Sequence, residues 1–329
     1  MTGTATTGVT TACYSVCGTR VEVRATDEVA ALIASRLGRW RSAEAVGPVE
    51  VSFEVRAGAD EGFAARPAGS GRPVYEPPGG RLLYYEGPDQ LFITYPGAVR
   101  MLCSPAEGTV QSALLGDGAG PVLAAYQLFT VPLMEMMKRR GRPPLHAGCV
   151  ARRGRGLLLA GTSGCGKSTL TAALVRAGWD LVSDDTVFLR QAEEGGTRAW
   201  GLSGQVDLAD RSAAMFAELS HLVGRLPGAG RDKHPVDAGE AFGASVVASC
   251  RPRALVLPAL SGGRHSVLSP LPAPRALRQL VPDVLLTEPS ATQAHLDALA
   301  ALVREVDCYS LATGSDLDEA VDCLQGALG

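Results

Sequence analysis

One stretch of the sequence constrains the fold more than any other: a glycine-rich segment between an apolar run and a helical pattern. Residues 161–168, Gly-Thr-Ser-Gly-Cys-Gly-Lys-Ser, fit the pattern G-x-x-x-x-G-K-[ST]. The run 156–160 before them is typical of a buried strand, and residues 169–175 are typical of a helix. This order predicts a loop whose backbone N–H groups face one centre at a helix N-terminus and bind phosphate.

The same pattern predicts a role for individual side chains of the loop. We expect Lys167 to reach the terminal phosphates of a nucleotide and the Ser168 hydroxyl to ligate Mg²⁺. ATP and Mg²⁺ are therefore the expected cofactors. The residues of this segment expected to bind the nucleotide are Gly161, Ser163, Gly164, Cys165, Gly166, Lys167, Ser168 and Thr169.

A pair of acids follows shortly after the loop. Asp184 and Asp185 stand between two predicted strands, at 180–183 and 186–189. Acidic residues at the carboxyl end of a strand beside a phosphate loop are placed to meet Mg²⁺ or a reacting hydroxyl. The alternative is a solvated acidic turn, and the short distance in sequence from Ser168 favours the functional interpretation.

Length and charge limit the class of protein. A chain of 329 residues predicts two domains, and a net charge of −3 gives no electrostatic reason to expect nucleic acid. The eight cysteines form no CxxC pair, which predicts reduced, mostly buried thiols and no zinc site. The first residues lack a signal-peptide pattern, and the most apolar window, 122–137, is too short and polar to cross a bilayer. We therefore expect a cytoplasmic protein with no membrane partner.

Alternating patterns predict a mostly β N-terminal domain over residues 1–120, with a covering or substrate-presenting role. Its expected strands lie near 20–24, 49–55, 81–86, 91–95 and 99–103, with a helix at 28–41 and a long loop at 58–80.

Residues 121–329 are expected to form the nucleotide-binding domain. A helix predicted at 121–141 ends in Lys138-Arg139-Arg140, for which a favourable helix C-terminus is preferred over a basic patch. Residues 201–242 are expected to be irregular, and the basic loop 228–234 either closes over phosphates or is an ordinary solvated loop. Strands are expected at 253–257 and 308–311, and helices from a capping box at Ser290 and from Ser315.

These motifs together resemble a known family. Leu145-His146-Ala147, the strand and loop of 156–168, Arg176-Ala177-Gly178 and Ser183-Asp184-Asp185 resemble the HPr kinase/phosphorylase family. They look most like its lasso-peptide precursor kinases, found beside natural-product clusters, and the close match covers about residues 144–189. The resemblance implies an α/β fold of the phosphoenolpyruvate-carboxykinase type, a mixed sheet with helices, and phosphoryl transfer from ATP to a serine hydroxyl.

The resemblance also implies roles for site residues. Asp184 is expected to accept the hydroxyl proton, while Asp185 is expected to hold the metal together with Ser168. His146 is expected to orient one of these acids. Arg231 and Lys233 fall roughly where relatives place basic residues that contact phosphate.

The sequence departs from the family at one signature. A Glu-x-Arg pair is missing near residues 200–204, so neither phosphorylase activity nor HPr as the substrate is expected. Three hypotheses stay open: a kinase acting on a serine of a peptide or biosynthetic precursor, a kinase of a small hydroxylated metabolite such as an amino acid or antibiotic, and an ATP-gated binding module. The expected partner is a peptide or small-molecule hydroxyl acceptor, and a homo-oligomer is left open.

Overall fold

The computed structural model describes residues 8–41, 48–58, 62–73, 82–87, 89–115, 126–224, 233–283 and 289–327. The chain separates into two compact units. The first comprises Met1–Arg140 with Leu286–Ala291, and the second comprises Gly141–Leu285 with Thr292–Gly329. The division therefore falls about twenty residues later than the boundary predicted after residue 120. Within the described residues, no helix is both long enough and apolar enough to cross a membrane.

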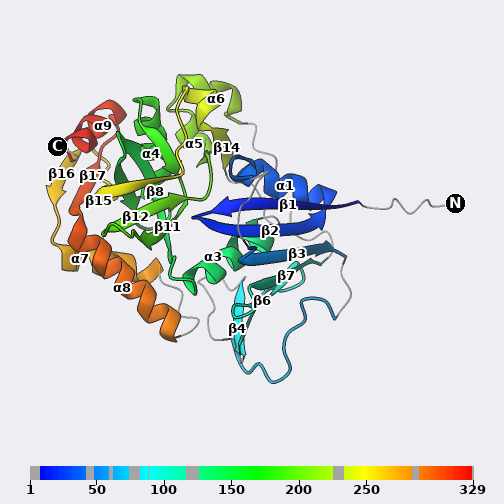
Figure 1. Ribbon diagram of the computed structural model, residues 1–329. Coiled ribbons are helices and arrows are strands. Elements are labelled where there is room, and N and C mark those ends of the chain that lie inside the picture. Colours follow the sequence, from blue (N-terminus) through cyan, green and yellow to red (C-terminus); the bar gives the residue numbers. More distant parts are fainter. Residues whose placement is uncertain are drawn as a thin grey trace. The chain divides into compact units, whose positions relative to one another are not determined.

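The first unit is built on one sheet, whose order among the described residues is β1-β2-β3-β7-β6-β5-β4 (Figure 1). β2, β3 and β7 run parallel to one another, and the other neighbours are antiparallel. The predicted meander is confirmed as β4-β5-β6 and continues into β7. The strands are β1 (Val9–Val16), β2 (Thr19–Thr26), β3 (Val51–Ala57), β4 (Leu83–Gly87), β5 (Gln90–Tyr95), β6 (Val99–Ser104) and β7 (Thr109–Leu114).

A helix makes the crossover that the parallel pair β2 and β3 requires. α1 (Asp27–Leu37) lies between them in sequence and is followed by the short helix η1 (Gly38–Trp40). Its side chains at Val29, Ile33 and Leu37 recur every four residues and are all buried. The predicted helix at 28–41 is thus confirmed, with its regular part ending at Leu37.

The predicted helix at 121–141 is confirmed over its described part. A π-helical turn, η3 (Tyr126–Thr130), leads into α3 (Val131–Lys138), and residues 121–125 lie outside the described residues. Phe129 packs on Phe53 of β3, with ring centroids 4.7 Å apart, so this helix belongs with the first sheet.

The basic cluster at the end of α3 is bonded within the first unit. Lys138 Nζ and Arg139 Nη1 lie 3.6 Å and 2.5 Å from Oε2 of the buried Glu135. Arg140 donates to the carbonyl oxygens of Met136 and Glu50 at 3.2 Å and 3.1 Å. These cations lie at the C-terminus of the helix and bond to neighbouring groups, as the sequence favoured. They do not form a basic patch.

The second unit is a mixed α/β unit, which confirms the coarse fold class expected for the C-terminal part. Its main sheet follows the order β10-β8-β11-β12-β15-β17-β16 among the described residues, and β9 pairs with both β8 and β15. β9, β15 and β17 are parallel, so their carboxyl ends meet at one edge. The strands are β8 (Pro144–Arg152), β9 (Arg155–Ala160), β10 (Asp180–Ser183), β11 (Thr186–Gln191), β12 (Thr197–Gly201), β15 (Ser249–Leu260), β16 (Val267–Pro270) and β17 (Asp307–Thr313).

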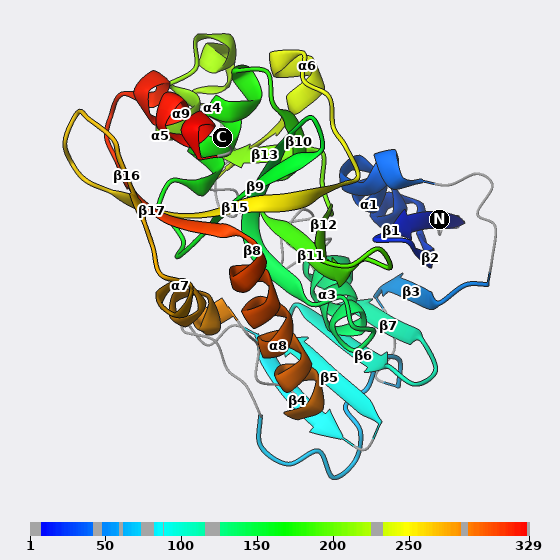
Figure 2. The same ribbon diagram turned by 60° about the vertical axis from the view of Figure 1, so that its left-hand side comes forward.

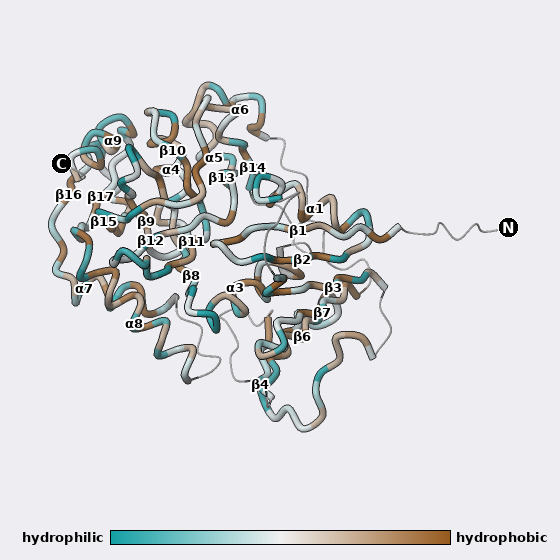
Figure 3. The backbone as a smooth tube through the Cα atoms, in the orientation of Figure 1, coloured by the Kyte–Doolittle hydropathy of each residue, from teal (hydrophilic) through white to brown (hydrophobic). Residues whose placement is uncertain are grey.

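Helices cover both faces of the sheet at β9 and its neighbour β15, and Figure 2 shows helices on both sides of these two strands. Leu157 and Leu159 point into a core shared with α4 (Lys167–Arg176) and α9 (Leu317–Gly326). Leu158 and Ala160 point into the core on the other face, with α7 (Ala273–Leu280) and α8 (Pro289–Glu305). The continuous apolar run of β9, which lies among the brown segments of Figure 3, follows from this two-sided burial.

The expectation that residues 201–242 are irregular was wrong for their described part, which leaves out 225–232. They form β13 (Gln205–Leu208), α5 (Asp210–Ala213), η4 (Ala217–Leu222), β14 (His234–Asp237) and α6 (Ala238–Phe242). β13 and β14 pair with each other across a separation of 26 residues, with Leu208 opposite His234. Strands of four residues whose partner is distant carry too short a local pattern to be recognised.

Smaller expectations were also corrected. β1 and β7 were missed because threonine, serine and glutamine interrupt their apolar residues. α8 begins at Pro289, so Ser290 lies inside the helix and does not precede it. α9 is capped by Asp316, whose side chain accepts from the Glu319 amide at 3.1 Å. None of the eight cysteines, all of which lie in the described residues, forms a disulfide bond, and five of them are buried, as expected.

Candidate functional site

The glycine-rich segment forms a tight loop between β9 and α4, as its sequence predicts. Gly161, Gly164 and Gly166 adopt φ angles of 140°, 83° and 100°, which side chains with a Cβ rarely adopt. Gly166 is the N-cap of α4, and its carbonyl oxygen accepts from the Leu170 amide at 2.9 Å. The loop therefore leads directly into the first turn of a helix, where the backbone N–H groups favour the binding of an anion.

Lys167 is the first residue of α4 and is only 7% exposed. Its Nζ donates to the carbonyl oxygens of Gly161 at 2.6 Å and Thr162 at 3.1 Å. The ammonium group is thus held over the loop that the glycines shape. This is the position from which a lysine can reach phosphate groups bound by the same loop.

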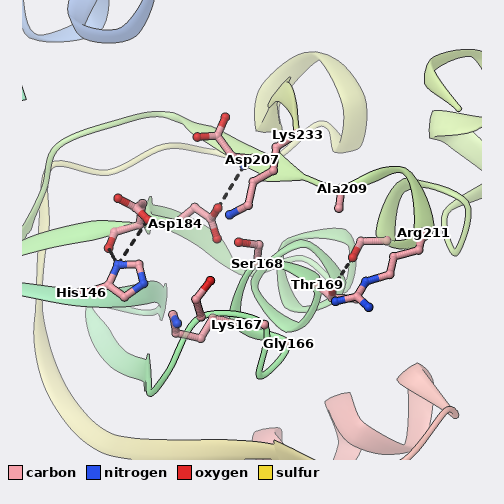
Figure 4. Close-up of a pocket in the computed structure, with 14 residues that line it drawn as sticks. His146, Gly166, Lys167, Ser168, Thr169, Asp184, Asp207, Ala209, Arg211 and Lys233 are labelled. Carbon is pink, nitrogen blue, oxygen red and sulfur yellow. Dashed lines mark hydrogen bonds and ion pairs between the residues drawn. The ribbon is translucent and has the colours of Figure 1, made fainter. Parts of the chain in front are cut away.

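The loop, the acids and His146 line one cavity of ≈ 330 Å³ (Figure 4). All of its lining residues belong to the second unit. Of the loop residues expected to bind nucleotide, Gly161 and Cys165 belong to the loop without lining this cavity. The lining residues are His146, Ser163, Gly164, Gly166, Lys167, Ser168, Thr169, Asp184, Asp185, Asp207, Ala209, Arg211, Ser212 and Lys233.

Sheet topology explains why His146 and the two acids meet. β10 and β11 flank β8 on either side, and Asp184 and Asp185 connect β10 to β11. Thr186 lies opposite His146 in the β8–β11 ladder. The Ala147 amide donates to the carbonyl oxygen of Asp185 at 3.0 Å, which fixes the connection against β8.

Asp184 is buried, with 3% exposure. Its Oδ2 accepts from the Asp207 amide at 3.0 Å, and its Oδ1 is buried without a hydrogen-bond partner in the part of the chain that is described. Burial raises the pKa of Asp184 to about 7, against smaller lowering effects of the Asp207 amide and the nearby Ser168 hydroxyl. Asp184 therefore changes its charge near neutral pH and presents an oxygen that can still accept a proton or a cation.

Asp185 lies in a different environment although it is the next residue. His146 Nδ1 is 3.0 Å from its carbonyl oxygen and 3.3 Å from its Oδ1, and the Thr186 hydroxyl donates to its Oδ2 at 3.1 Å. Burial raises the pKa of Asp185, but His146, the Thr186 hydroxyl and the charge of Lys233 together lower it to about 2. Asp185 is therefore ionised at any ordinary pH.

Four lining residues from β13 and α5 were missed in the sequence. They are Asp207, Ala209, Arg211 and Ser212. The signal that was present is the alternation of Val206 and Leu208, both fully buried, around the polar Asp207. This alternation is typical of a short strand with one polar face, but it covers too few residues to identify the strand alone or its neighbour in space.

The two basic residues expected near phosphate have different outcomes. Lys233 lines the cavity, and its side chain extends toward Asp184 and Ser168 (Figure 4). Arg231 lies outside the described residues, so its expected contact stays a prediction.

The site offers oxygen ligands suited to Mg²⁺. Within the described ranges, no cluster of three or more His, Cys, Asp and Glu side chains is arranged to hold a metal by itself. Mg²⁺ in phosphoryl-transfer sites takes only one or two protein carboxylates, and substrate phosphates and water supply the other ligands. The Asp184 carboxylate fits that requirement, because it lies near the Ser168 hydroxyl and its Oδ1 has no hydrogen-bond partner among the described residues.

Comparison with known proteins gives little beyond this geometry. Neither a family model nor a curated protein matches the sequence. Among solved structures, the chain is similar to the Hpr(Ser) kinase/phosphatase from Coxiella burnetii, with 14% identity over 55% of this chain and 92% of that chain and a TM-score of 0.29. A likeness at this level establishes neither a shared site nor a shared activity.

Proposed function

We propose that this chain is an ATP-dependent phosphotransferase that transfers the γ-phosphoryl group to the hydroxyl of a serine, or a similar group, in a peptide or biosynthetic precursor. One observation carries the proposal. A glycine-rich loop with a lysine at a helix N-terminus and an aspartate with a pKa of about 7 line the same cavity. Phosphoryl transfer needs both a cradle for polyphosphate and a proton acceptor for the attacking hydroxyl.

In the proposed reaction, the loop amides and Lys167 hold the β- and γ-phosphates. The acceptor oxygen attacks the γ-phosphorus in line, the bond from this phosphorus to the bridging oxygen breaks, and ADP leaves. The hydroxyl proton passes to Asp184. The transition state for such transfer is loose, so positioning of the two substrates contributes more than activation of the nucleophile.

Mg²⁺ would be held by the Ser168 hydroxyl and a carboxylate of the acid pair, and it would supply positive charge to the phosphates. Two observations bear on which acid plays which part. The proximity of Ser168 to Asp184 supports a metal-side role for Asp184, whereas a pKa of about 7 supports a proton-accepting role. We assign the proton to Asp184, because both oxygens of Asp185 already lie beside His146 and Thr186 and a pKa of about 2 makes Asp185 a weak proton acceptor.

His146 is proposed to act through Asp185. Its Nδ1 contacts both the backbone and the side chain of that acid, which fixes the connection between β10 and β11. The fold resembling phosphoenolpyruvate carboxykinase and the link to lasso-peptide precursor kinases belong to this proposal as hypotheses.

The test is direct detection of transfer. The full chain would be incubated with ATP and Mg²⁺ and with peptides encoded by neighbouring genes, and mass spectrometry would detect an added phosphate on serine. The Asp184→Asn variant is the matched control, because it keeps the side-chain shape and removes the proton acceptor. ATP binding without any phosphorylated peptide or metabolite would overturn the proposal in favour of an ATP-gated binding module. A phosphorylated metabolite alone would replace the peptide as acceptor.

A further inference from the structure

The β13–α5–β14 segment, which the sequence predicted to be irregular, supplies three charged residues of the cavity. Asp207 lies on β13, Arg211 on α5, and Lys233 immediately before β14. In Figure 4, Lys233 extends toward Asp184 and Ser168, whereas Arg211 extends toward the start of α4 near Thr169. The two cations therefore extend toward two separate places in the same cavity.

A polar contact connects the elements that carry these cations. Asp210 Oδ1 lies 2.6 Å from His234 Nε2, and the His234 side chain is 7% exposed. The same Asp210 oxygen accepts from the Gly224 amide at 3.4 Å. Asp210 thus contacts residues that precede and follow 225–232 in sequence.

Each residue of the Asp210–His234 contact is adjacent in sequence to one of the two cations. Arg211 follows Asp210, and Lys233 precedes His234. The backbone positions of both cations are therefore fixed within one residue of the Asp210–His234 contact. The pairing of Leu208 with His234 is the last of the β13–β14 ladder, so α5 itself gains its connection to β14 through Asp210.

α5 is also fixed on its other side. The Thr169 hydroxyl, in the first turn of α4, donates to Ser212 Oγ at 2.8 Å. α5 is therefore connected to the helix that follows the phosphate loop and to the strand that follows Lys233. A displacement of Asp210 from His234 changes the distance between the two cations, while the phosphate loop itself keeps its shape.

We propose that Asp210 and His234 are positioning residues, whose contact places Arg211 and Lys233 at the two ends of a bound polyphosphate. The inference rests on the proposed function, because it takes the ligand to be a triphosphate. Its competitor is a contact that only stabilises the β13–β14 pair. The two differ in one respect: a positioning contact acts on affinity through the cations, whereas a purely stabilising contact does not.

The test is a double-mutant cycle on binding, measured by calorimetry with Mg-ATP and with inorganic triphosphate. Asp210→Ala is expected to raise Kd about tenfold, the size typical for the loss of a charge-assisted hydrogen bond. Asp210→Asn keeps an acceptor oxygen and is expected to restore most of the affinity. In a background carrying Lys233→Ala and Arg211→Ala, the effect of Asp210→Ala is expected to disappear.

Asp237→Ala is the matched control. Asp237 caps α6 at the other end of β14, where it accepts from the amides of Gly239 and Glu240. Its loss is expected to lower stability and leave Kd unchanged. His234→Leu, which removes the donor toward Asp210, carries the test if Asp210→Ala fails to fold, and it is expected to raise Kd by a similar factor.

Each outcome decides between a positioning contact and a purely stabilising contact. An unchanged Kd in Asp210→Ala, or an equal effect with and without the two cations, overturns the inference and leaves the proposed function intact. Failure of the wild-type protein to bind either triphosphate removes the proposed function and this inference together.

Discussion

Replacement of Asp184 by asparagine should make the protein more stable at alkaline pH, although it removes the proposed proton acceptor. Asp184 is 3% exposed, and its pKa is raised from 3.8 to about 7. Between these two values the folded protein binds a proton that the unfolded chain has released. Stability therefore falls as pH rises through this window, because folding requires the uptake of a proton whose concentration in solution falls.

The size of the effect follows from the difference in pKa. A difference of about 3 pKa units corresponds to about 4 kcal/mol of unfolding free energy once the pH exceeds both values. At pH 5, where the unfolded carboxyl is already largely ionised and the folded one is not, the same relation gives about 2 kcal/mol. The stability gain of Asp184→Asn should therefore grow by about 2 kcal/mol between pH 5 and pH 8.

The assay is urea unfolding of wild type and variant at pH 5, 6, 7 and 8, in the presence of EDTA so that no divalent cation neutralises the carboxylate. The pH-dependent part of the difference is the readout, because an asparagine also changes hydrogen bonding by an amount that does not depend on pH. Asp322→Asn, at an exposed position of α9, controls for the loss of one negative charge. A difference between wild type and Asp184→Asn that stays constant over this range would refute the buried-carboxylate argument.

Three further predictions address the loop, the second acid and the packing behind the site. Lys167→Ala should weaken Mg-ATP binding at least tenfold in calorimetry, because the ammonium group is held over the glycine-rich loop that is proposed to bind phosphate; wild-type affinity in this variant would remove Lys167 from phosphate binding. Asp185→Asn should act with the opposite sign from Asp184→Asn: its pKa of about 2 stabilises the fold above pH 3.8, and this contribution is lost as pH falls toward 2. Solvent screening at a side chain that is 36% exposed limits the loss to about 1 kcal/mol in urea unfolding at pH 7, and a gain in stability at that pH would contradict the lowered pKa. Gly201→Ala should cost about 2 kcal/mol or more, because an added Cβ would lie 1.8 Å from the carbonyl oxygen of Val182; Gly326→Ala, where nothing lies within 4 Å, is the control, and equal stability of the two variants would show that β12 can shift.

The part of the site that the sequence predicted is the part that is local in the chain. The strand, loop and helix around Lys167 are contiguous, and each glycine with positive φ is required where it stands. Asp184 and Asp185 directly follow a strand that carries the apolar pair Leu181 and Val182. In such segments, the residues that interact are the residues that are neighbours in sequence.

The part that was missed depends on pairing between distant segments. β13 and β14 are four residues each, and neither has enough alternation to be identified alone. Their pairing brings Asp207 to Asp184, across 23 residues of sequence, through a backbone amide and not through a side chain. Because a backbone amide makes this contact, the sequence shows no preference for a particular residue at position 207. The cavity-lining residues of β13 and α5 were therefore indicated only by the alternation of Val206 and Leu208.

The opposite pKa values of Asp184 and Asp185 show why the identity of neighbouring residues is a poor guide to their chemistry. The carboxylate of Asp184 lies beside the Asp207 amide and Ser168, where burial outweighs its hydrogen bonds. The carboxylate of Asp185 lies beside His146, Thr186 and the charge of Lys233, where these partners outweigh burial. Divergent environments of this kind separate a group that can take up a proton from one that keeps its charge. Because Asp207 and Lys233 both come from the β13–α5–β14 segment, the different roles proposed for the two acids depend on a segment whose fold the sequence did not predict.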